Sequence, residues 1–248
     1  MKVHALWRHP IKGHGAERLA RVRLTAGETL PWDRRWAVVD EGARLGGEDG
    51  AWAPCRNFGR GAKSPALMAV GARWDEGARS MTLTHPERPD LVFDPDAEGD
   101  RLIEWARPLY GQGRPGPVRV VRAEGQGMTD APEPFLSIHS LASLRALSEA
   151  AGRPLDMRRF RGNLWLDGPA LWEEDEWVGR SLRVGAAVLE VVEPIFRCRA
   201  TEAAPETGRS DADTLGAMTS LRGETSFGVY ARVLEGGEVA EGDASAPA

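Results

Sequence analysis

The sequence contains only two cysteines, Cys55 and Cys198, among 248 residues. The two lie far apart and form no CxxC pair, which excludes a zinc knuckle and an iron–sulfur site of the usual spacing. Two cysteines so far apart in the sequence also provide no disulfide framework. We therefore expect two free thiols and a cytoplasmic, reducing environment.

Long apolar stretches are missing as well. No window approaches the ~18 consecutive apolar residues of a membrane helix, and residues 1–13 contain no continuous apolar core of a secretory signal. The pattern GxxxxGK is absent and no internal repeat is found. The single GxGxxG match, at 111–116, lies in a glycine- and proline-rich segment that is followed by a predicted strand and not by a helix, so it does not indicate a phosphate-binding loop. We expect no membrane partner and none of the common phosphate-binding loops.

Lysine is scarce: the chain has three lysines among 32 basic residues, and its net charge is −5 at pH 7. Because nucleic-acid binding requires a basic surface, we expect no nucleic-acid partner. Two local clusters of arginine, at Arg34-Arg35 and at 158–161, contrast with the negative net charge of the chain. Guanidinium groups suit bidentate phosphate binding, although an isolated cluster is more commonly a solvated face paired with carboxylates.

The chain is long enough for one large domain or two small ones. A glycine- and proline-rich segment at 111–117 is the most linker-like stretch, and we place a domain boundary there. Short alternating apolar segments at this spacing predict a β-barrel or β-sandwich, not βαβ units. The predicted strands lie at 3–7, 22–25, 33–40, 67–70, 81–83, 91–93, 118–121, 163–168, 182–184, 188–192 and 227–234.

Three segments predict helices. The strongest pattern runs from Ser140 to Ala151, with Ser140 as the N-cap and leucines at every third position. Gly152 then occupies the position at which a glycine ends many helices. Shorter helices are predicted at 100–107 and at 214–221.

The stretch from Pro194 to Gly208 places Cys198 between two arginines, directly after an apolar, β-branched segment. Cationic neighbours favour the thiolate, which is both a nucleophile and a metal ligand. A single cysteine is, however, most often a small buried hydrophobe, and the local sequence alone favours that alternative. Cys55 has no surrounding motif, and we interpret it as structural.

Six short motifs follow one another along the chain. They are Pro10-Ile11-Lys12, Asp33-Arg34-Arg35-Trp36, Arg161-Gly162-Asn163, Glu174-Asp175-Glu176-Trp177, Arg197-Cys198 with Pro205-Glu206-Thr207-Gly208, and Phe227-Gly228-Val229-Tyr230 with Gly242-Asp243. Each motif alone is weak. In this order and spacing, however, the chain resembles the MOSC family, named for the C-terminal domain of molybdenum-cofactor sulfurase. The family includes the mitochondrial amidoxime-reducing components and bacterial N-hydroxylated-base reductases.

The resemblance covers about residues 1–243 and implies an α+β, β-rich fold. It implies an N-terminal MOSC β-barrel-like domain at 1–110 and a C-terminal MOSC β-barrel domain with a few helices at 111–243. Residues 244–248 are small and polar, and we expect them to form a disordered tail.

The resemblance implies that Cys198 is the catalytic residue and the thiolate ligand of molybdenum. It also implies that Lys12 and Arg34 contact the pyranopterin and its phosphate. The full set of implied cofactor-binding residues is Lys12, Arg34, Arg161, Asn163, Arg197, Thr201, Thr207 and Gly208. These residue types suit the molybdenum cofactor (molybdopterin with Mo), because soft thiolate ligands suit the metal and arginine forks bind phosphate.

The sequence departs from the family pattern at five positions. His9 replaces the usual tyrosine, Gly13 replaces a serine, and Gly162 replaces the proline of an F-R-P-N segment. Glu202 and Ala204 replace a threonine and an aspartate in the metal loop. Glu202 is also a candidate proton donor, although an exposed glutamate without such a role is the usual case.

The resemblance implies an oxidoreductase that reduces N-hydroxylated or N-oxide small molecules by oxygen-atom transfer at Cys-ligated molybdenum. Because the chain has no ferredoxin-type cysteines, a separate electron-donor protein is implied, which would be a ferredoxin, a flavoprotein or a reductase. An alternative is a carrier or sulfur-transfer protein for the cofactor, without reductase activity of its own. Such a carrier could not generate sulfur itself, since no pyridoxal phosphate domain is present. A third alternative is a molybdenum-free module that binds an anionic small molecule.

Overall fold

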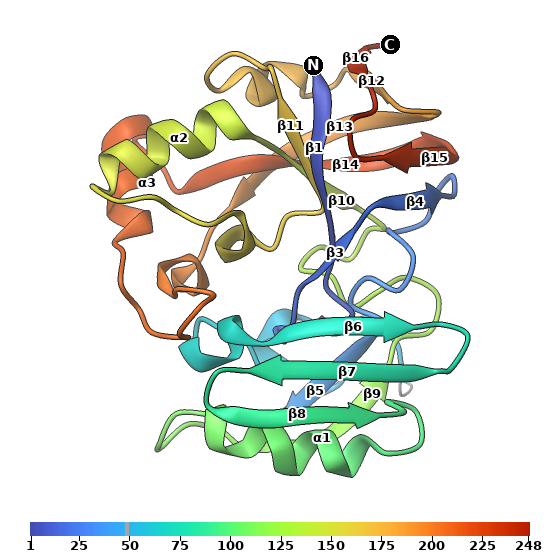
Figure 1. The fold of residues 1–248 in the computed structure, drawn as a ribbon, viewed down its shortest axis with the longest axis vertical. Helices are drawn as coiled ribbons and strands as arrows, with labels where there is room; N and C mark the ends of the chain where they lie inside the picture. The colour runs from blue at the N-terminus through green and yellow to red at the C-terminus, as the bar shows by residue number, and fades with distance from the viewer. Residues whose placement is uncertain (48–49) are drawn as a thin grey trace.

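The computed structural model describes residues 1–47 and 50–248. Figure 1 shows two β-rich bodies stacked along the longest axis, which we call the upper and the lower body, with both chain ends in the upper body. The upper body carries helices α2 (Leu141–Ala150) and α3 (Thr214–Arg222), and the lower body carries α1 (Gly99–Ala106). The β-rich α+β fold class predicted from the sequence is therefore confirmed.

Two three-stranded sheets and α1 form the lower body. Trp36 and Trp74, one from each sheet, meet edge to face with ring centroids 4.7 Å apart. Such aromatic pairs bury a large apolar area, and this one joins the two sheets. The first sheet has the order β2 (Ile11–Lys12), β5 (Trp36–Asp40), β9 (Pro117–Arg122), and the second is the meander β6 (Gly71–Asp75), β7 (Ser80–His85), β8 (Arg88–Phe93).

An eight-stranded sheet forms the centre of the upper body. Leu189 and Val191 on one strand, and Val229 and Ala231 on the next, are spaced by two and buried. This spacing is what a strand with one core-facing side requires. The sheet order is β16 (Ser245–Pro247), β12 (Ser181–Val184), β13 (Ala187–Phe196), β14 (Ser226–Glu235), β10 (Leu136–Ser140), β11 (Leu164–Asp167), β1 (Lys2–Arg8) and β3 (Glu17–Leu19).

The chain crosses between the bodies more often than the sequence suggests. β1 and β3 lie in the upper sheet, and β4 (Arg21–Leu24) pairs with β15 (Gly237–Ala240) near the other end of the chain. β9 follows the expected linker but returns to the lower body, where it pairs with β5. Strands on each side of the boundary expected at 110–111 therefore also pair with strands on the other side, because strands find partners far away in the sequence.

The three helices are confirmed, and two of them show side-chain N-caps. Ser140 Oγ accepts a hydrogen bond from the backbone N–H of Ala142 at 3.1 Å, and Gly152 follows α2 with a φ of 67°. Asp213 Oδ1 accepts from the backbone N–H of Gly216 at 2.8 Å at the start of α3. In the part of the chain that the structure describes, no helix is long and apolar enough to cross a membrane.

Two local expectations are wrong. Residues 67–70 do not form a strand, because Pro65–Ala69 is a 3-10 helix with proline at its first position, where the missing N–H costs nothing. The tail at 244–248 is not disordered. Instead, Ser245–Pro247 forms β16 beside β12, and the Ala248 N–H donates to the Ser181 carbonyl at 2.9 Å. The open edge of β12 offers backbone partners that the polar composition of the tail does not reveal.

Candidate functional site

A cavity of about 130 Å³ lies where the two bodies meet, and we call it the interbody cavity. The lower body contributes Lys12, Arg34 and Cys55 to its walls, and the upper body contributes Arg161 and Cys198. Seven of the nine residues predicted from the sequence line it: Lys12, Arg34, Arg161, Asn163, Arg197, Cys198 and Thr201.

Thr207 and Gly208 do not line the cavity. Thr207 Oγ1 accepts a hydrogen bond from the backbone N–H of Arg209 at 3.3 Å. Gly208 has a φ of +66°, and a Cβ there would lie 2.5 Å from Cα of Ala66 in the lower body. The absence of a side chain at Gly208 therefore lets the loop after Cys198 pack against the lower body, and this packing holds the loop in place.

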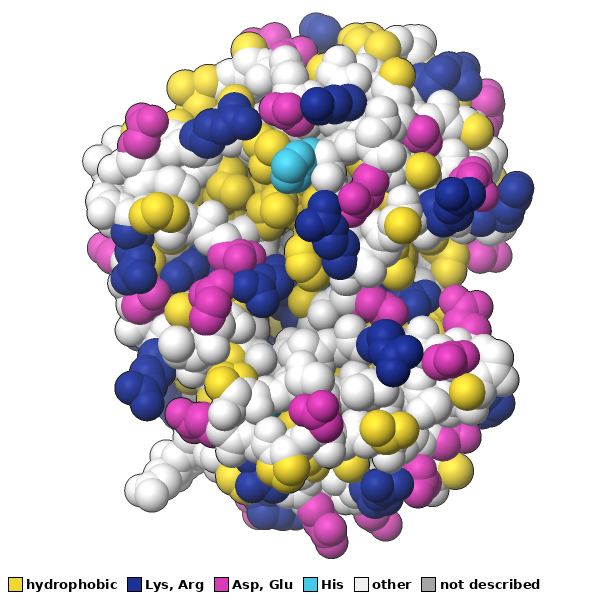
Figure 2. All heavy atoms as spheres, viewed as in Figure 1, with side chains coloured by type: hydrophobic (Ala, Val, Ile, Leu, Met, Phe, Trp, Pro, Cys, Tyr) yellow, Lys and Arg dark blue, Asp and Glu magenta, His cyan; other side chains and the backbone are white. Residues whose placement is uncertain are grey.

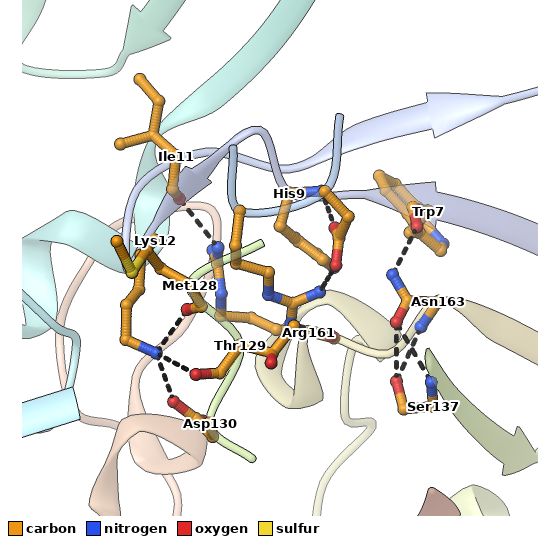
Figure 3. Close-up of polar contacts among 12 residues, drawn as sticks. Trp7, His9, Ile11, Lys12, Met128, Thr129, Asp130, Ser137, Arg161 and Asn163 are labelled. Atoms are coloured by element: carbon orange, nitrogen blue, oxygen red, sulfur yellow. Dashed lines mark hydrogen bonds and ion pairs between the residues drawn. The ribbon is translucent and has the colours of Figure 1, made fainter. Parts of the chain in front are cut away.

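Lys12 lies in β2 with its side chain buried, and its three donors are all used (Figure 3). Nζ donates to the carbonyls of Met128 at 2.8 Å and Thr129 at 3.1 Å, and to Asp130 Oδ1 at 2.6 Å. Burial lowers the pKa of Lys12, while Asp130 opposes the shift. Desolvation within the cavity acts to raise the pKa of Asp130, although 69% of its side chain is accessible. Lys12 and neighbouring arginines outweigh this effect and lower that pKa to about 2. Lys12 thus fixes the 128–130 segment as one cavity wall.

Arg34 and Arg161 both adopt left-handed backbone conformations, each with a φ of 49°. Arg34 pairs with Asp33, and its Nη2 donates to the Arg161 carbonyl at 2.9 Å. Residues held in this sparsely populated region cluster at functional sites in proteins. The Arg34 guanidinium thus joins the lower body to the backbone of Arg161 in the upper body at the cavity.

Arg161 reaches from the upper body to the loop around β2, as Figure 3 shows. Nη1 donates to the Gly15 carbonyl at 2.9 Å and Nη2 to the Ile11 carbonyl at 3.2 Å. Burial, with a smaller effect of Arg34, lowers the pKa of Arg161 to about 9. A buried guanidinium that donates to neutral carbonyls beside a second cation favours an anion in the adjoining space.

Arg197 anchors the backbone immediately before Cys198. Its Nε and Nη2 donate to the Phe227 carbonyl at 2.8 and 2.6 Å, and Nη1 donates to the Phe160 carbonyl at 2.9 Å. Burial lowers its pKa to about 10. Cys198 itself is exposed and carries a free thiol. The alternative of a small buried cysteine is therefore wrong, and the thiol lines the interbody cavity on a rigid support.

Asn163 and Thr201 hold the backbone around the cavity. Asn163 Oδ1 accepts from the Ser137 N–H at 3.1 Å, and its Nδ2 donates to the Trp7 carbonyl at 3.2 Å (Figure 3). Thr201 Oγ1 donates to the Cys198 carbonyl at 3.1 Å and also contacts a neighbouring hydroxyl, that of Thr214, at 2.6 Å. Both residues therefore position this site through internal hydrogen bonds.

The structure explains two departures from the family pattern. A Cβ at Gly162 would clash with the His139 ring, so the imidazole occupies the space that a side chain at 162 would need. A Cβ at Gly13 would clash with the carbonyl of Gly59, and Gly13 has a φ of +72°. A serine at position 13 would thus need both a strained backbone and a shifted neighbour.

Glu202 and Ala204 lie outside the cavity lining. The Glu202 carboxylate accepts from Arg199 Nε at 3.1 Å, and Ala204 is buried. The largely buried Glu202 carboxylate thus pairs with an exposed arginine outside the cavity lining, and its role as a proton donor stays a prediction.

Sequence reasoning missed Cys55 and Arg60, which both line the interbody cavity. Arg60 Nη1 lies 3.0 Å from Cys55 Sγ, and Arg60 Nε is buried without a hydrogen-bond partner among the described residues. No motif surrounds either residue. The segment reaches the cavity because it packs against the upper body, where a Cβ at Gly61 would lie 3.3 Å from Cβ of Ala200.

Positive charge dominates the interbody cavity. Asp33 and Asp211 each pair with a lining arginine but are not part of the lining. On the face shown in Figure 2, acidic and basic side chains are interspersed. A concentration of positive charge in a partly desolvated site favours an anionic ligand. Among the residues that the structure describes, the lining has six cations and one carboxylate, which are Lys12, Arg34, Arg60, Arg159, Arg161 and Arg197, with Asp130.

Comparison with solved structures gives two similar chains. The YuaD protein from Bacillus subtilis is 12% identical, with 98% of this chain and 93% of that chain covered and a TM-score of 0.47. YiiM from Geobacillus stearothermophilus is 23% identical, with 46% of this chain and 53% of that chain covered and a TM-score of 0.35. No curated protein matches.

Comparison with protein families gives two matches in chain order. The family model of the MOSC N-terminal beta barrel domain matches residues 1–107, and that of the MOSC domain matches residues 125–245. Together they span most of the chain and confirm the resemblance inferred from the six motifs. The chain belongs to the MOSC family, whose domains are known to bind molybdenum cofactor.

Proposed function

We propose that this protein is a molybdenum-cofactor-dependent reductase of N-hydroxylated or N-oxide compounds, with Cys198 as the protein ligand of molybdenum. One observation supports this most strongly. The exposed thiol of Cys198 lines a cavity to which the described part of the chain contributes six cationic side chains and one carboxylate. A soft thiolate beside concentrated cationic donors complements an anionic pterin dithiolene with its phosphate.

The residues present fit this cofactor in distinct roles. Arg161 and Arg34 would hold its anionic groups, because both guanidinium groups line the cavity and Arg161 donates only to neutral acceptors within the described residues. Cys198 would hold the metal. Lys12, Asn163, Thr201 and Arg197 would act indirectly, since their hydrogen bonds fix the segments that form the walls.

When bound, the cofactor would supply a metal that accepts an oxygen atom and exchanges electrons. Reduction of an N-hydroxyl group consumes two electrons and two protons and releases water. The electrons would come from a separate donor protein, for which we propose a ferredoxin, a flavoprotein or a reductase. The chain's own contribution is to bind and orient the cofactor and the substrate beside Cys198.

The test combines metal and pterin analysis with a reduction assay. Protein purified from a host that makes the cofactor should contain near-stoichiometric molybdenum and pterin, and it should reduce benzamidoxime with an artificial electron donor. Protein that lacks both components, under conditions in which a known molybdoenzyme is loaded, would contradict the proposal. Loaded protein that reduces nothing, but restores activity to a cofactor-free enzyme, would instead support the carrier alternative.

The two cysteines provide a matched pair of variants. Cys198→Ser should keep the fold but lose molybdenum and turnover, because a hydroxyl is a poor ligand for a soft site. Cys55→Ser should keep its molybdenum, since the thiol of Cys55 already contacts Arg60 at 3.0 Å. Equal metal content in the Cys198→Ser variant and the wild type would refute the ligand role.

A further inference from the structure

Phe196 is the last residue of β13 and directly precedes the Arg197-Cys198 pair. Its side chain is 66% exposed, which is the largest value among the exposed large hydrophobic residues in the described part of the chain. It is also the only residue of that set to line the interbody cavity. An exposed aromatic ring at the wall of a site is stronger evidence of a ligand contact than an exposed ring on an open surface.

The backbone holds this ring at a fixed place. Phe196 pairs with Ser226 of β14, and the residue before it, Ile195, is buried. The Arg197 N–H after it donates to the Thr225 carbonyl at 2.9 Å. No ring-to-ring contact of Phe196 is found among the described residues, whereas Phe160 and Phe227 each have several. The ring of Phe196 therefore has a free face on a rigid strand end.

A substrate that reacts beside Cys198 must place its remaining organic part against nearby cavity walls. Phe196 is two residues away, and three further aromatic side chains, Phe135, Phe160 and Tyr230, line the same cavity. The ring centroids of Phe135 and Tyr230 lie 5.7 Å apart. Aromatic rings attract planar π-systems in offset-stacked or edge-to-face geometry. The aromatic part of the wall thus suits a flat, uncharged group.

We propose that Phe196 is a specificity-determining residue that stacks against planar aryl groups, so that aryl amidoximes and aryl hydroxylamines are preferred over their aliphatic counterparts. This inference rests on the proposed reductase function. It adds a substrate class and a residue that selects it, at a position outside the motifs that identify the family.

The experiment compares two substrates that share one reacting group, benzamidoxime and acetamidoxime, with an artificial electron donor. Phe196→Ala should raise the KM for benzamidoxime ~3- to 10-fold, the range for one aromatic contact. Phe196→Leu keeps apolar area without a ring and should recover part of this loss, while Phe196→Tyr should stay near wild type. The KM for acetamidoxime should stay within about twofold in all three variants, since a methyl group offers no π-face.

Leu234→Ala is the control, because Leu234 is also exposed and lies on β14 but does not line the cavity. It should change neither KM. Equal changes for both substrates in Phe196→Ala, or none for benzamidoxime, would overturn the inference. A change confined to the KM for a protein electron donor would also overturn it and would make Phe196 part of a docking surface.

A binding measurement separates this inference from the proposed function. If molybdenum-loaded wild type reduces neither substrate, the proposed function fails, and saturation-transfer NMR then decides the role of Phe196. Saturation of the benzamidoxime ring protons should be strong with wild type and Phe196→Tyr and weak with Phe196→Ala. Equal saturation with all three proteins would overturn the aryl contact.

Discussion

Nη2 of Arg197 lies 3.2 Å from Nε2 of His139, and the imidazole packs against the rings of Trp165 and Phe227. A guanidinium can only donate, so Nε2 accepts and the ring proton lies on Nδ1. Burial, followed by the charge of Arg197, lowers the pKa of His139 well below its ordinary value. A neutral histidine thus holds the arginine that supports Cys198.

The space around His139 predicts a non-additive pair of substitutions. Gly162→Ala should destabilise the protein by about 2 kcal/mol, because the new Cβ would clash with the imidazole. In the His139→Ala background, the same change should cost much less. Urea unfolding of the four proteins gives the coupling energy. Gly46→Ala is the control, since a Cβ there meets no described residue within 4 Å. Additive effects at 139 and 162 would contradict the prediction.

The buried histidines predict a loss of stability in mild acid. Burial lowers the pKa of His9 and His139 well below the ordinary value and that of His14 to about 4. Their stabilising contribution is therefore present above about pH 6.5, where the unfolded histidines are also neutral, and is lost as the pH falls. Each can contribute ~1.4 kcal/mol per pH unit. Urea unfolding between pH 7 and pH 5 measures this slope, and a free energy that rises toward pH 5 would contradict it.

Glu174 titrates in the opposite sense. It is buried, its Oε2 accepts from Ser143 Oγ at 2.9 Å, and burial raises its pKa to about 7. Its stabilising contribution is present below the unfolded pKa and is lost as the pH rises through about 7. Glu174→Gln removes this titration. The free energy of unfolding of the variant should therefore rise relative to that of wild type as the pH rises, by on the order of 3 kcal/mol between pH 5 and pH 8.

A matched control for Glu174 lies two residues further along. Glu176 is exposed, so Glu176→Gln makes the same carboxyl-to-amide change at a surface position. A pH-independent effect of Glu174→Gln would show that the buried carboxyl does not change its protonation in this range. In the Glu174→Gln background, the change of the free energy of unfolding with pH reports the histidines without the opposing titration of Glu174.

Lys12 and Asp130 form an ion pair whose two ends predict unequal effects. Nζ of Lys12 is buried, whereas the Asp130 side chain is 69% exposed. Lys12→Met should cost about 2–3 kcal/mol and reduce molybdenum content, because it leaves the Met128 and Thr129 carbonyls without their donor. Asp130→Asn should cost less than about 1 kcal/mol, since a solvent-exposed carboxylate contributes little to an ion pair.

Stability and metal content should be measured together for these two variants. Loss of molybdenum in Lys12→Met with an unchanged free energy of unfolding would mean that Lys12 contacts the cofactor directly, contrary to the internal hydrogen bonds seen here. Equal destabilisation by both substitutions would contradict the contrast in burial between the two side chains.

Short-range signals in the sequence were sufficient for several elements. The leucine spacing and Ser140 predicted α2, and the Ser140 hydroxyl does cap it. The apolar run before Cys198 predicted a strand, which extends to Phe196 as β13. The strand predicted at 67–70 is wrong because a short apolar run fits both a strand and a buried turn. Pro65 favours the turn, since it occupies the first position of the 3-10 helix.

The candidate site divides in the same way. Of the nine residues that the motifs selected, seven line one cavity. They did not predict that Lys12 would donate its hydrogen bonds to the 128–130 segment, or that Gly208 would pack against Ala66. A motif records which residues occur together, whereas the direction of each donor depends on the acceptors that folding brings near.

What the sequence by itself determined is local: where strands and helices form, which family's motifs occur, and that Cys198 follows a strand between two arginines. Only the tertiary structure decided that β1 joins the upper sheet, that Cys55 and Arg60 reach the same cavity as Cys198, and that this cavity is cationic. The physical reason is sequence distance. Periodicity and capping act within a few residues, whereas the Lys12–Asp130 pair joins positions 118 residues apart and depends on how both bodies pack.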